Sequence, residues 1–584
     1  MGKTAKAVFV LLLLSVAIAA QRASMPVPAV VLLGGGELVQ IEVEIKQGNG
    51  GVYVSTDPLV GIQTQESANT AFKVAANITG ADLDSYDVLV RLKDYGNTKS
   101  VDGPSGGTAM TLLMLSILEN KTIRSDLTVT GTISEDKKIG EVGEVGKKTK
   151  AAADAGMRVM LIPRNYDSFD KMVFSILGKR WNISIIEVDS IDDAARLAFS
   201  AKGTILDSNV MDIKPRTKLN LTVGELNCTD CRILEFKALA GKIIENNRAL
   251  VAEIRGSNRN EFSSFLDAFD SDIEQAEDAE KLNYVYTGAN SAFLTSINLN
   301  FLRESSVTPS TLKNRMLVVE SCIKSAKRPK MTEENFEWVA GGDERRAWSE
   351  KKLSEIEKLN YSDDEETTLF IFKELLTAET WCNVSHEMFS TADKIGGTPV
   401  DESRLRSLAS SRIAEGDEGI KSFAGMDLGD AAWRFEAARG EFNNGTFAAA
   451  IFDADYLLST IRTINETKDL EEYAANEFNV SKSWAGMWAA LYENHAEYIY
   501  LASKEGMGTL GSSVMLSIYA KNLNNDTIII KGLFKGILPV EPGQQTTATT
   551  EGNAQYPIEL ALLLVICVII AIFLNIIQFF RTAK

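Results

Sequence analysis

The feature that most constrains this chain is an uncharged apolar run close to its carboxyl end. The run extends from Leu560 to Phe580, and about 20 apolar residues are enough to cross a bilayer as a helix. Arg581 and Lys584 follow it directly, which by the positive-inside rule places the tail in the cytoplasm. We therefore expect a transmembrane helix over 558–580 and a cytoplasmic tail over 581–584.

A second apolar run lies near the amino end, from Ala7 to Ala20. It follows Lys3 and Lys6 and ends in small residues, as secretory signals do. The run is short for a full bilayer span, so it favours a signal peptide over 1–20 that is cleaved near Ala20, rather than an uncleaved anchor. Both runs predict a single-pass protein of the cell membrane whose bulk is extracytoplasmic.

N-glycosylation sequons agree with this location. A surface glycoprotein is expected from their number, although the sequence does not show which are used. The N-x-[ST] patterns start at Asn77, Asn120, Asn182, Asn220, Asn227, Asn360, Asn383, Asn444, Asn465, Asn479 and Asn525.

Length and charge narrow the class of protein further. The chain has 584 residues, which predicts two or more domains. Its net charge of −18 argues against a nucleic-acid partner, which would need a basic surface.

The cysteines favour disulfides over a metal site. Cys228 and Cys231 form a C-x-x-C pattern, Cys322 and Cys382 are isolated, and Cys567 lies in the expected membrane span. The chain has only two histidines and no second C-x-x-C, so we expect no zinc site. A redox role for the C-x-x-C pair remains an alternative that nothing around it supports.

Periodicity divides the rest of the chain into two main domains. Over 28–203, strand and helix patterns alternate, and Ile41, Val43 and Ile45 mark one face of a strand. Ser190 is an expected helix N-cap. The pattern predicts an α/β domain with a mixed sheet.

Long helical patterns follow a polar linker at 204–224. Over 225–535 they predict a bundle or a solenoid of helix pairs, as in the stretch with Ala450, Ala454 and Leu457 at helical spacing. Residues 537–557 are rich in Pro, Thr and Gly and are expected to form a stalk.

The candidate chemistry starts at Ser105, in the stretch VDGPSGGTAM. Pro104 and Gly106 suit a sharp turn into a helix, and the free N–H groups of a helix start favour negative charge. Such a place would stabilise a serine alkoxide or a substrate oxyanion. The alternative is a simple helix-starting serine.

Lys148 is the candidate base, in GEVGEVGKKTKAAADAG. On a helix it shares a face with Ala151, Ala152 and Ala155, so it is predicted to point inward, where burial lowers its pKa. A lysine with its head in water is the alternative. The stretch is not a phosphate-binding loop, because Glu141 stands where the first glycine of that motif should be.

Together the two residues predict a Ser–Lys dyad, in which a neutral amine takes the hydroxyl proton. Both histidines, His386 and His495, are far away in the sequence. Thr130, after the strand pattern LTV, is a candidate for orienting the amine.

The order DGPSGGTAM, VTGTI, IGEVGEVGKKTKAAADAG and VMLIP resembles the proteolytic domain of Lon-type proteases over roughly 34–200. The resemblance implies an α+β (α/β) Lon-type domain, here followed by a mainly α-helical domain and a C-terminal transmembrane helix. It also implies that Ser105 is the nucleophile, Lys148 the general base and Thr130 its support. Asp102 matches the acidic residue before Gly-Pro-Ser, Gly106 lies beside the expected oxyanion donors, and Glu66 falls on a family helix without a firm role. Thr132 stands where the family has glutamate.

The sequence thus predicts an ATP-independent serine endopeptidase that cleaves unfolded or loosely structured polypeptides, with no cofactor and no metal. It carries no Walker motif. The resemblance also implies a homo-oligomer, as a hexameric ring. A non-catalytic surface-binding protein and a self-cleaving precursor are the alternatives.

Overall fold

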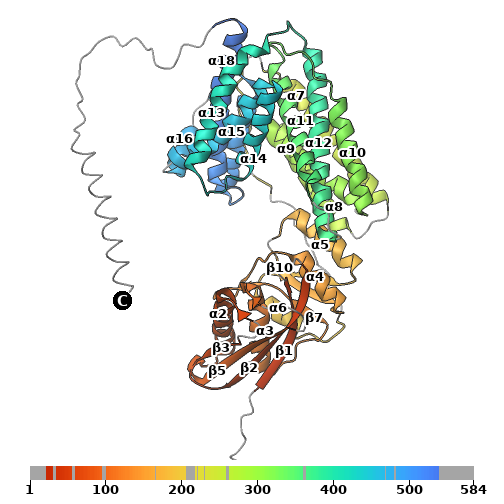
Figure 1. Cartoon of the computed structure of the whole chain (residues 1–584), viewed down its shortest axis with the longest axis vertical. Helices are drawn as coiled ribbons and strands as arrows, with labels where there is room; N and C mark the ends of the chain where they lie inside the picture. Colours follow the sequence, from red (N-terminus) through yellow and green to blue (C-terminus); the bar gives the residue numbers. More distant parts are fainter. Residues whose placement is uncertain are drawn as a thin grey trace, which may run out of the picture. The chain divides into compact units, whose positions relative to one another are not determined.

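In the computed structural model, the described elements up to residue 198 are strands and helices, and those after residue 233 are helices (Figure 1). It describes residues 21–537 except 31–34, 56–58, 95–99, 165, 205–217, 220, 229–230, 258–261, 305, 360–363, 467–468 and 479–481. The expected signal peptide, stalk, transmembrane helix and tail lie outside the described residues, as does most of the expected linker. Among the helices that are described, none combines the length and the apolar character needed to span a membrane.

The first sheet has the strand order β1-β2-β5-β3 and is mixed, because β1, β2 and β5 pair antiparallel whereas β3 is parallel to β5. Its strands are β1 (Gln21–Val30), β2 (Gly36–Gln47), β5 (Tyr86–Asp94) and β3 (Val52–Val54). The predicted face of Ile41, Val43 and Ile45 is buried, which confirms the strand periodicity. The sequence did not predict β1, whose Pro26 and Pro28 disfavour a central strand. They are tolerated because β1 lies at the edge of the sheet.

A second, three-stranded sheet has the order β11-β10-β7 and is entirely parallel. It consists of β11 (Ser184–Val188), β10 (Val159–Pro163) and β7 (Leu127–Val129). Two short pairs complete the strands, β4 (Leu59–Val60) with β6 (Ser100–Val101) and β8 (Thr132–Ile133) with β9 (Ile139–Gly140). The predicted mixed sheet is therefore confirmed by the first sheet, whereas the separate parallel sheet was not predicted.

The segment LTVTGTI shows why the sheets separate. The N–H of Thr130 donates to Leu161 O at 3.0 Å, and the N–H of Gly131 donates to Ser105 O at 2.9 Å. The chain leaves β7 at these two bonds and enters β8. The segment LTVTGTI, which has the pattern of one strand, therefore contributes to two sheets.

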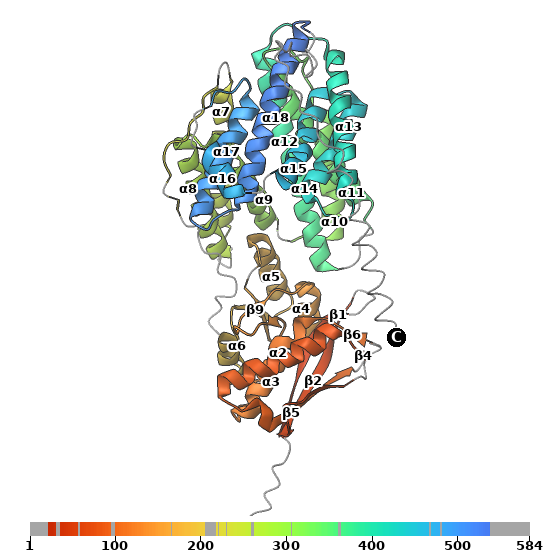
Figure 2. The ribbon, with the colours of Figure 1, turned by 90° about the vertical axis from the view of Figure 1, so that its left-hand side faces the viewer.

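Helices pack against the first sheet. Both α3 and α4 contact β1 and β2, and Figure 2 shows α2 beside α3. The expected N-cap at Ser190 is confirmed, because its side chain accepts from Asp193 N. The helices of this part are α2 (Ile62–Thr79), α3 (Gly107–Leu118), α4 (Val145–Asp154), α5 (Ser168–Arg180) and α6 (Ile191–Ala198), with 3-10 turns η1 (Leu83–Ser85) and η2 (Pro104–Gly106).

The second part is helical, as predicted. Its helices are α7 (Ile233–Gly256), α8 (Ser263–Lys281), α9 (Val285–Arg303), α10 (Pro309–Ser325), α11 (Phe336–Glu357), α12 (Glu365–Ile395), η4 (Glu402–Leu405), α13 (Arg406–Ser422), α14 (Gly429–Asn444), α15 (Phe447–Glu466), α16 (Leu470–Glu477), α17 (Met487–Lys504) and α18 (Leu510–Phe534).

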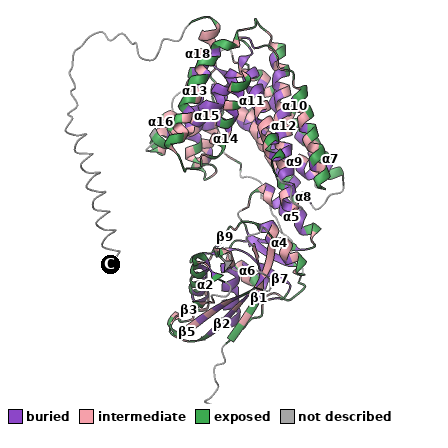
Figure 3. Cartoon of the chain, in the orientation of Figure 1, coloured by how far each residue is buried: buried purple, intermediate pink, exposed green. Residues whose placement is uncertain are grey.

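Helices distant in sequence pack together in this part. For example, α9 contacts α17 and α11 contacts α15. A solenoid, in which each pair contacts only its neighbours, would lack such contacts, so the helices form a bundle. Buried residues gather where the helices face one another (Figure 3).

Candidate active site

Ser105 lies on a turn that three hydrogen bonds hold in place. Thr64 Oγ1 donates to Gly103 O at 3.0 Å, Ser67 Oγ donates to Pro104 O at 3.1 Å, and Gly131 N donates to Ser105 O. Thr64 and Ser67 come from α2, far from the serine in the sequence. They are site residues that sequence reasoning missed, because nothing local links a threonine to a carbonyl on another element.

Two glycines are required by the geometry of this turn. Gly103 has φ 126°, a backbone conformation that side chains disfavour. A Cβ at Gly107 would lie 2.5 Å from Ser67 Oγ and 2.8 Å from Ile133 Cγ2. The turn therefore brings α3, α2 and β8 into close approach, and Ser105 is held half-buried at their junction.

Lys148 lies on α4 and is 6% exposed, which confirms that it points inward. Its neighbours on the other face are paired, Lys147 with Glu144 and Lys150 with Asp154. Among the described residues no ion pair or hydrogen bond reaches the Lys148 ammonium. Burial lowers the pKa of Lys148 to about 8, while the Glu144 carboxylate acts against this by raising it.

Glu144 itself has a strained backbone. It precedes α4 with φ 60° and ψ 37°, in the left-handed region that residues other than glycine rarely adopt. It gives α4 no side-chain cap. Instead, Gly146 N donates to Glu366 Oε1 at 3.0 Å, and burial raises the pKa of Glu366 to about 7. The sequence did not indicate either acidic residue as part of the site.

Ser105 and Lys148 line one cleft of about 460 Å³. Its apolar side comes from β1, β2, β5 and α3, through Val27, Val39, Ile41, Leu92 and Met110. No hydrogen bond joins the two side chains among the described residues. Catalytic hydrogen bonds are often long without substrate and tighten when it binds.

The other predicted residues divide into two groups. Asp102 and Gly106 line the cleft, and Asp102 Oδ1 accepts from Gly103 N at 2.9 Å. Thr130 does not line it. Its side chain is fully buried, and its hydroxyl has no hydrogen-bond partner. Glu66 is exposed on α2, outside the cleft lining.

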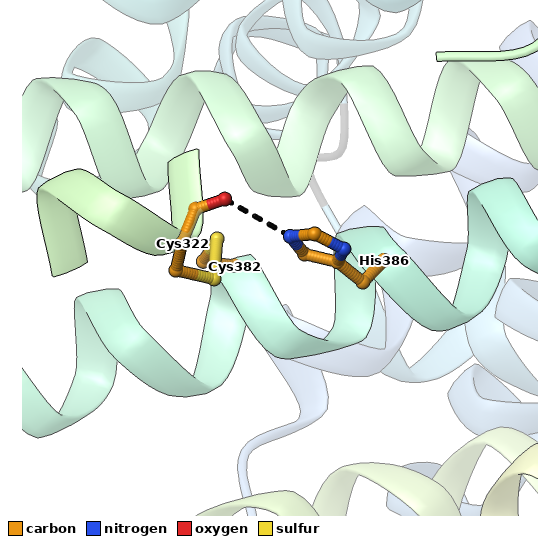
Figure 4. Close-up of side chains that lie close together, drawn as sticks. All are labelled: Cys322, Cys382 and His386. Carbon is orange, nitrogen blue, oxygen red and sulfur yellow. Dashed lines mark hydrogen bonds between the residues drawn. A yellow bond between two sulfur atoms is a disulfide. The ribbon is translucent and has the colours of Figure 1, made fainter. Parts of the chain in front are cut away.

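The cysteines pair as disulfides, Cys228 with Cys231 and Cys322 with Cys382, as we expected. His386 approaches the second pair, with Nε2 2.9 Å from Cys322 O (Figure 4). The sulfur and ring nitrogen atoms lie within 4.8 Å of one another, close enough to share a metal ion. Because the sulfur atoms are bonded to each other, neither is the thiolate that zinc binds.

Comparison with known proteins identifies the first part. Residues 29–201 match the family described as the Lon protease (S16) C-terminal proteolytic domain. The Lon protease of Phenylobacterium zucineum is 31% identical over 166 residues, 27% of this chain and 20% of that protein. That of Xanthomonas oryzae pv. oryzae is 35% identical over 135 residues, 22% of this chain and 15% of that protein.

These matches place residues 29–201 in the class of proteolytic domains. In particular, this segment belongs to the family of Lon-type proteolytic domains, which confirms the resemblance expected over roughly 34–200. The chain spans about a fifth of the length of the relatives with which it aligns.

Proposed function

We propose that the protein is a membrane-anchored, extracytoplasmic serine endopeptidase that cleaves unfolded or loosely structured polypeptides without ATP. The observation that carries the proposal is a buried lysine without an ion partner in the same cleft as a serine on a tight turn. The apolar runs at 1–20 and 558–580 support the location, and the family resemblance supports a homo-oligomer.

In the proposed mechanism, Ser105 attacks the carbonyl carbon of the substrate while the neutral amine of Lys148 takes the hydroxyl proton. Backbone N–H groups of Ser105 and Gly106, at the helix start, stabilise the oxyanion. The C–N bond then breaks, and the Lys148 ammonium gives its proton to the leaving amine. Lys148 then takes a proton from water as the water oxygen attacks the acyl carbon. The bond from that carbon to Ser105 Oγ breaks, the Lys148 ammonium returns the proton to Oγ, and the acyl group leaves as a carboxylic acid that ionises in water.

Each supporting residue has a limited part in this scheme. Thr64 and Ser67 hold the turn that carries the nucleophile, so they are positioning residues. Thr130 would support the amine if its unpaired hydroxyl turns toward Lys148 in the substrate complex. A cleft of about 460 Å³ has room for an extended peptide segment but not for a folded domain, which fits loose substrates.

The test uses the full-length protein in detergent micelles without ATP. Unfolded casein is incubated with the parent, with Ser105→Ala and with Lys148→Ala. Lys150→Ala is the matched control, because Lys150 is on the same helix but is paired with Asp154. We expect cleavage by the parent and the control only.

Equal cleavage by all four versions would remove the dyad from the mechanism. Cleavage that needs ATP would contradict the independence from ATP. No cleavage by any version, with all four folded, would favour a non-catalytic surface-binding protein. The location is tested separately, because an epitope fused after Lys584 should be protected from external protease in intact cells while the preceding domains are digested.

A further inference from the structure

Two adjoining cavities open between helices of the bundle, away from the protease cleft. The larger, here called the groove, has a volume of about 500 Å³ and runs along α7, α9 and α12. The smaller, here called the tryptophan pocket, has about 90 Å³ and adds residues of α11 and α17. The two share four lining residues, Leu239, Ile243, Phe293 and Val384.

Nearly half of the residues that line the tryptophan pocket are aromatic. They include Phe236, Tyr286, Trp348, Trp381 and Trp488. A cavity of this size holds about three water-sized volumes, so it suits the end of a ligand rather than its middle. Aromatic walls of this kind bind apolar groups.

Arg345 is the charged residue that lines this pocket. It is 6% exposed, and its guanidinium carbon lies 4.8 Å from the ring centres of both Trp348 and Trp488. Its Nη1 atom donates to Glu344 Oε2 at 2.5 Å and to Gly341 O at 3.4 Å. Within the described part of the chain, Nε and Nη2 have no acceptor.

The charged groups around Arg345 are compatible with a bound anion. Arg434 pairs with Asp453 at 2.7 Å, and Asp453 also accepts from Trp348 Nε1. Glu344 lies between the two arginines, and burial raises its pKa to about 8. Burial therefore disfavours the charged form of Glu344, which weakens its attraction for the Arg345 guanidinium.

A carboxylate is the anion whose shape fits these free donors, because a guanidinium binds it with two parallel N–H bonds. The groove offers polar groups along the same path. The side-chain amides of Asn246 and Asn290, in the groove and the pocket respectively, have no partner among the described residues. A peptide backbone can use such amides, whereas a plain hydrocarbon chain cannot.

We propose that the tryptophan pocket binds the free C-terminal carboxylate of a polypeptide whose last residue is apolar, and that the groove holds the residues before it. Peptides released by the protease domain would have such ends, since its cleft has an apolar side; this choice of source rests on the proposed function. Binding of the peptide to the pocket does not depend on the proposed function, so it is tested in a protein whose proposed nucleophile is removed.

The experiment is calorimetric titration of full-length Ser105→Ala protein in detergent micelles. The probes are a hexapeptide that ends in leucine with a free carboxylate, its C-terminal amide, and the same peptide ending in aspartate. Loss of one charge-assisted contact of this kind typically weakens binding about 10- to 100-fold. We expect that loss for the amide, and weaker binding of the aspartate peptide.

Two variants in the Ser105→Ala background locate the site. Arg345→Met should cause the same loss, whereas Arg346→Met should not, because Arg346 pairs with Glu350 and lies outside both cavities. If Arg345→Met fails to fold, Asn290→Phe, at a half-buried position of the pocket, should block binding by filling it. Equal affinity for the acid and the amide would overturn the proposal. So would equal affinity for the leucine peptide and for decanoate, a plain hydrocarbon carboxylate titrated in the same way. So would unchanged binding by folded Arg345→Met or Asn290→Phe.

Discussion

Replacing Lys148 by methionine should make the protease domain more stable, because the native fold buries an ammonium group without a partner. The pKa of Lys148 is about 8 in the fold, against about 10.4 in an unfolded chain. Below pH 8 both states carry the proton, and the fold bears the full cost of burial. This difference in pKa corresponds to about 3 kcal/mol.

The sign of the pH dependence follows from proton counting. Between pH 8 and about pH 10.4 the unfolded chain binds more protons than the native one, so the stability of the parent rises with pH. Methionine has a similar length and no charge. The gain from Lys148→Met should therefore be about 3 kcal/mol at pH 7 and should disappear near pH 10.4.

Scanning calorimetry of the full-length protein measures this gain. A change of 1 kcal/mol shifts the midpoint by about 2–4 °C in a domain of this size, so the protease-domain transition should rise by roughly 6–12 °C at pH 7. Lys150→Met, at a half-buried ion-paired position, is the control and should shift it little. An unchanged midpoint, or the same rise at pH 7 and pH 10.4, would show that the Lys148 ammonium is hydrated in the fold.

Three further outcomes concern activity. Cleavage should rise about tenfold from pH 7 to pH 9 as Lys148, with its pKa of about 8, loses its proton; a flat rate profile would contradict a lysine base. Glu144→Gln should move that profile to lower pH by a few tenths of a unit, since it removes an anion that raises the pKa of Lys148, and a move to higher pH would refute this electrostatic coupling. Gly103→Ala should reduce activity at least tenfold and destabilise the domain by about 1 kcal/mol or more, because side chains disfavour φ 126°. Calorimetry and casein cleavage together check this, and a fully active, stable variant would contradict a strained turn.

Local patterns predicted much of the protease domain. The alternation in β2 and the helical spacing around Lys148 depend only on residues close in sequence. Burial confirms the first, and confirms the second for Lys148 and Ala152 but not for Ala155, which is exposed after the end of α4. The sequence did not predict the edge strand β1, because prolines argue against a strand in general. They are tolerated at the edge of a sheet, and only the fold shows that β1 lies there. Thr64 and Ser67 were missed for a similar reason, since their hydrogen bonds reach residues that are 39 and 37 positions away.

The helical part shows a different limit of sequence reasoning. In α11 the run Asp343-Glu344-Arg345 has the composition of a solvated helix face, yet all three residues are buried. Asp343 and Glu344 have partners on other elements, Arg328 and Arg434 respectively, although Glu344 also pairs with Arg345 beside it. No local pattern identifies a buried charge whose partner is about 90 residues further along the chain.

The way in which buried cations are paired separates structural residues from candidate functional ones. Arg124 and Lys171 are both buried, and each is paired with a carboxylate, Asp126 and Glu187 respectively. Such pairs are ordinary structural solutions to a buried charge. Lys148 has no partner in the described structure. Arg345 is paired with Glu344 but uses only one of its nitrogen atoms as a donor. Because a buried cation with unused donors lowers stability, Lys148 and Arg345 both support the proposals made above. In each proposal a bound molecule completes the pairing, a substrate in the protease cleft and a carboxylate in the tryptophan pocket.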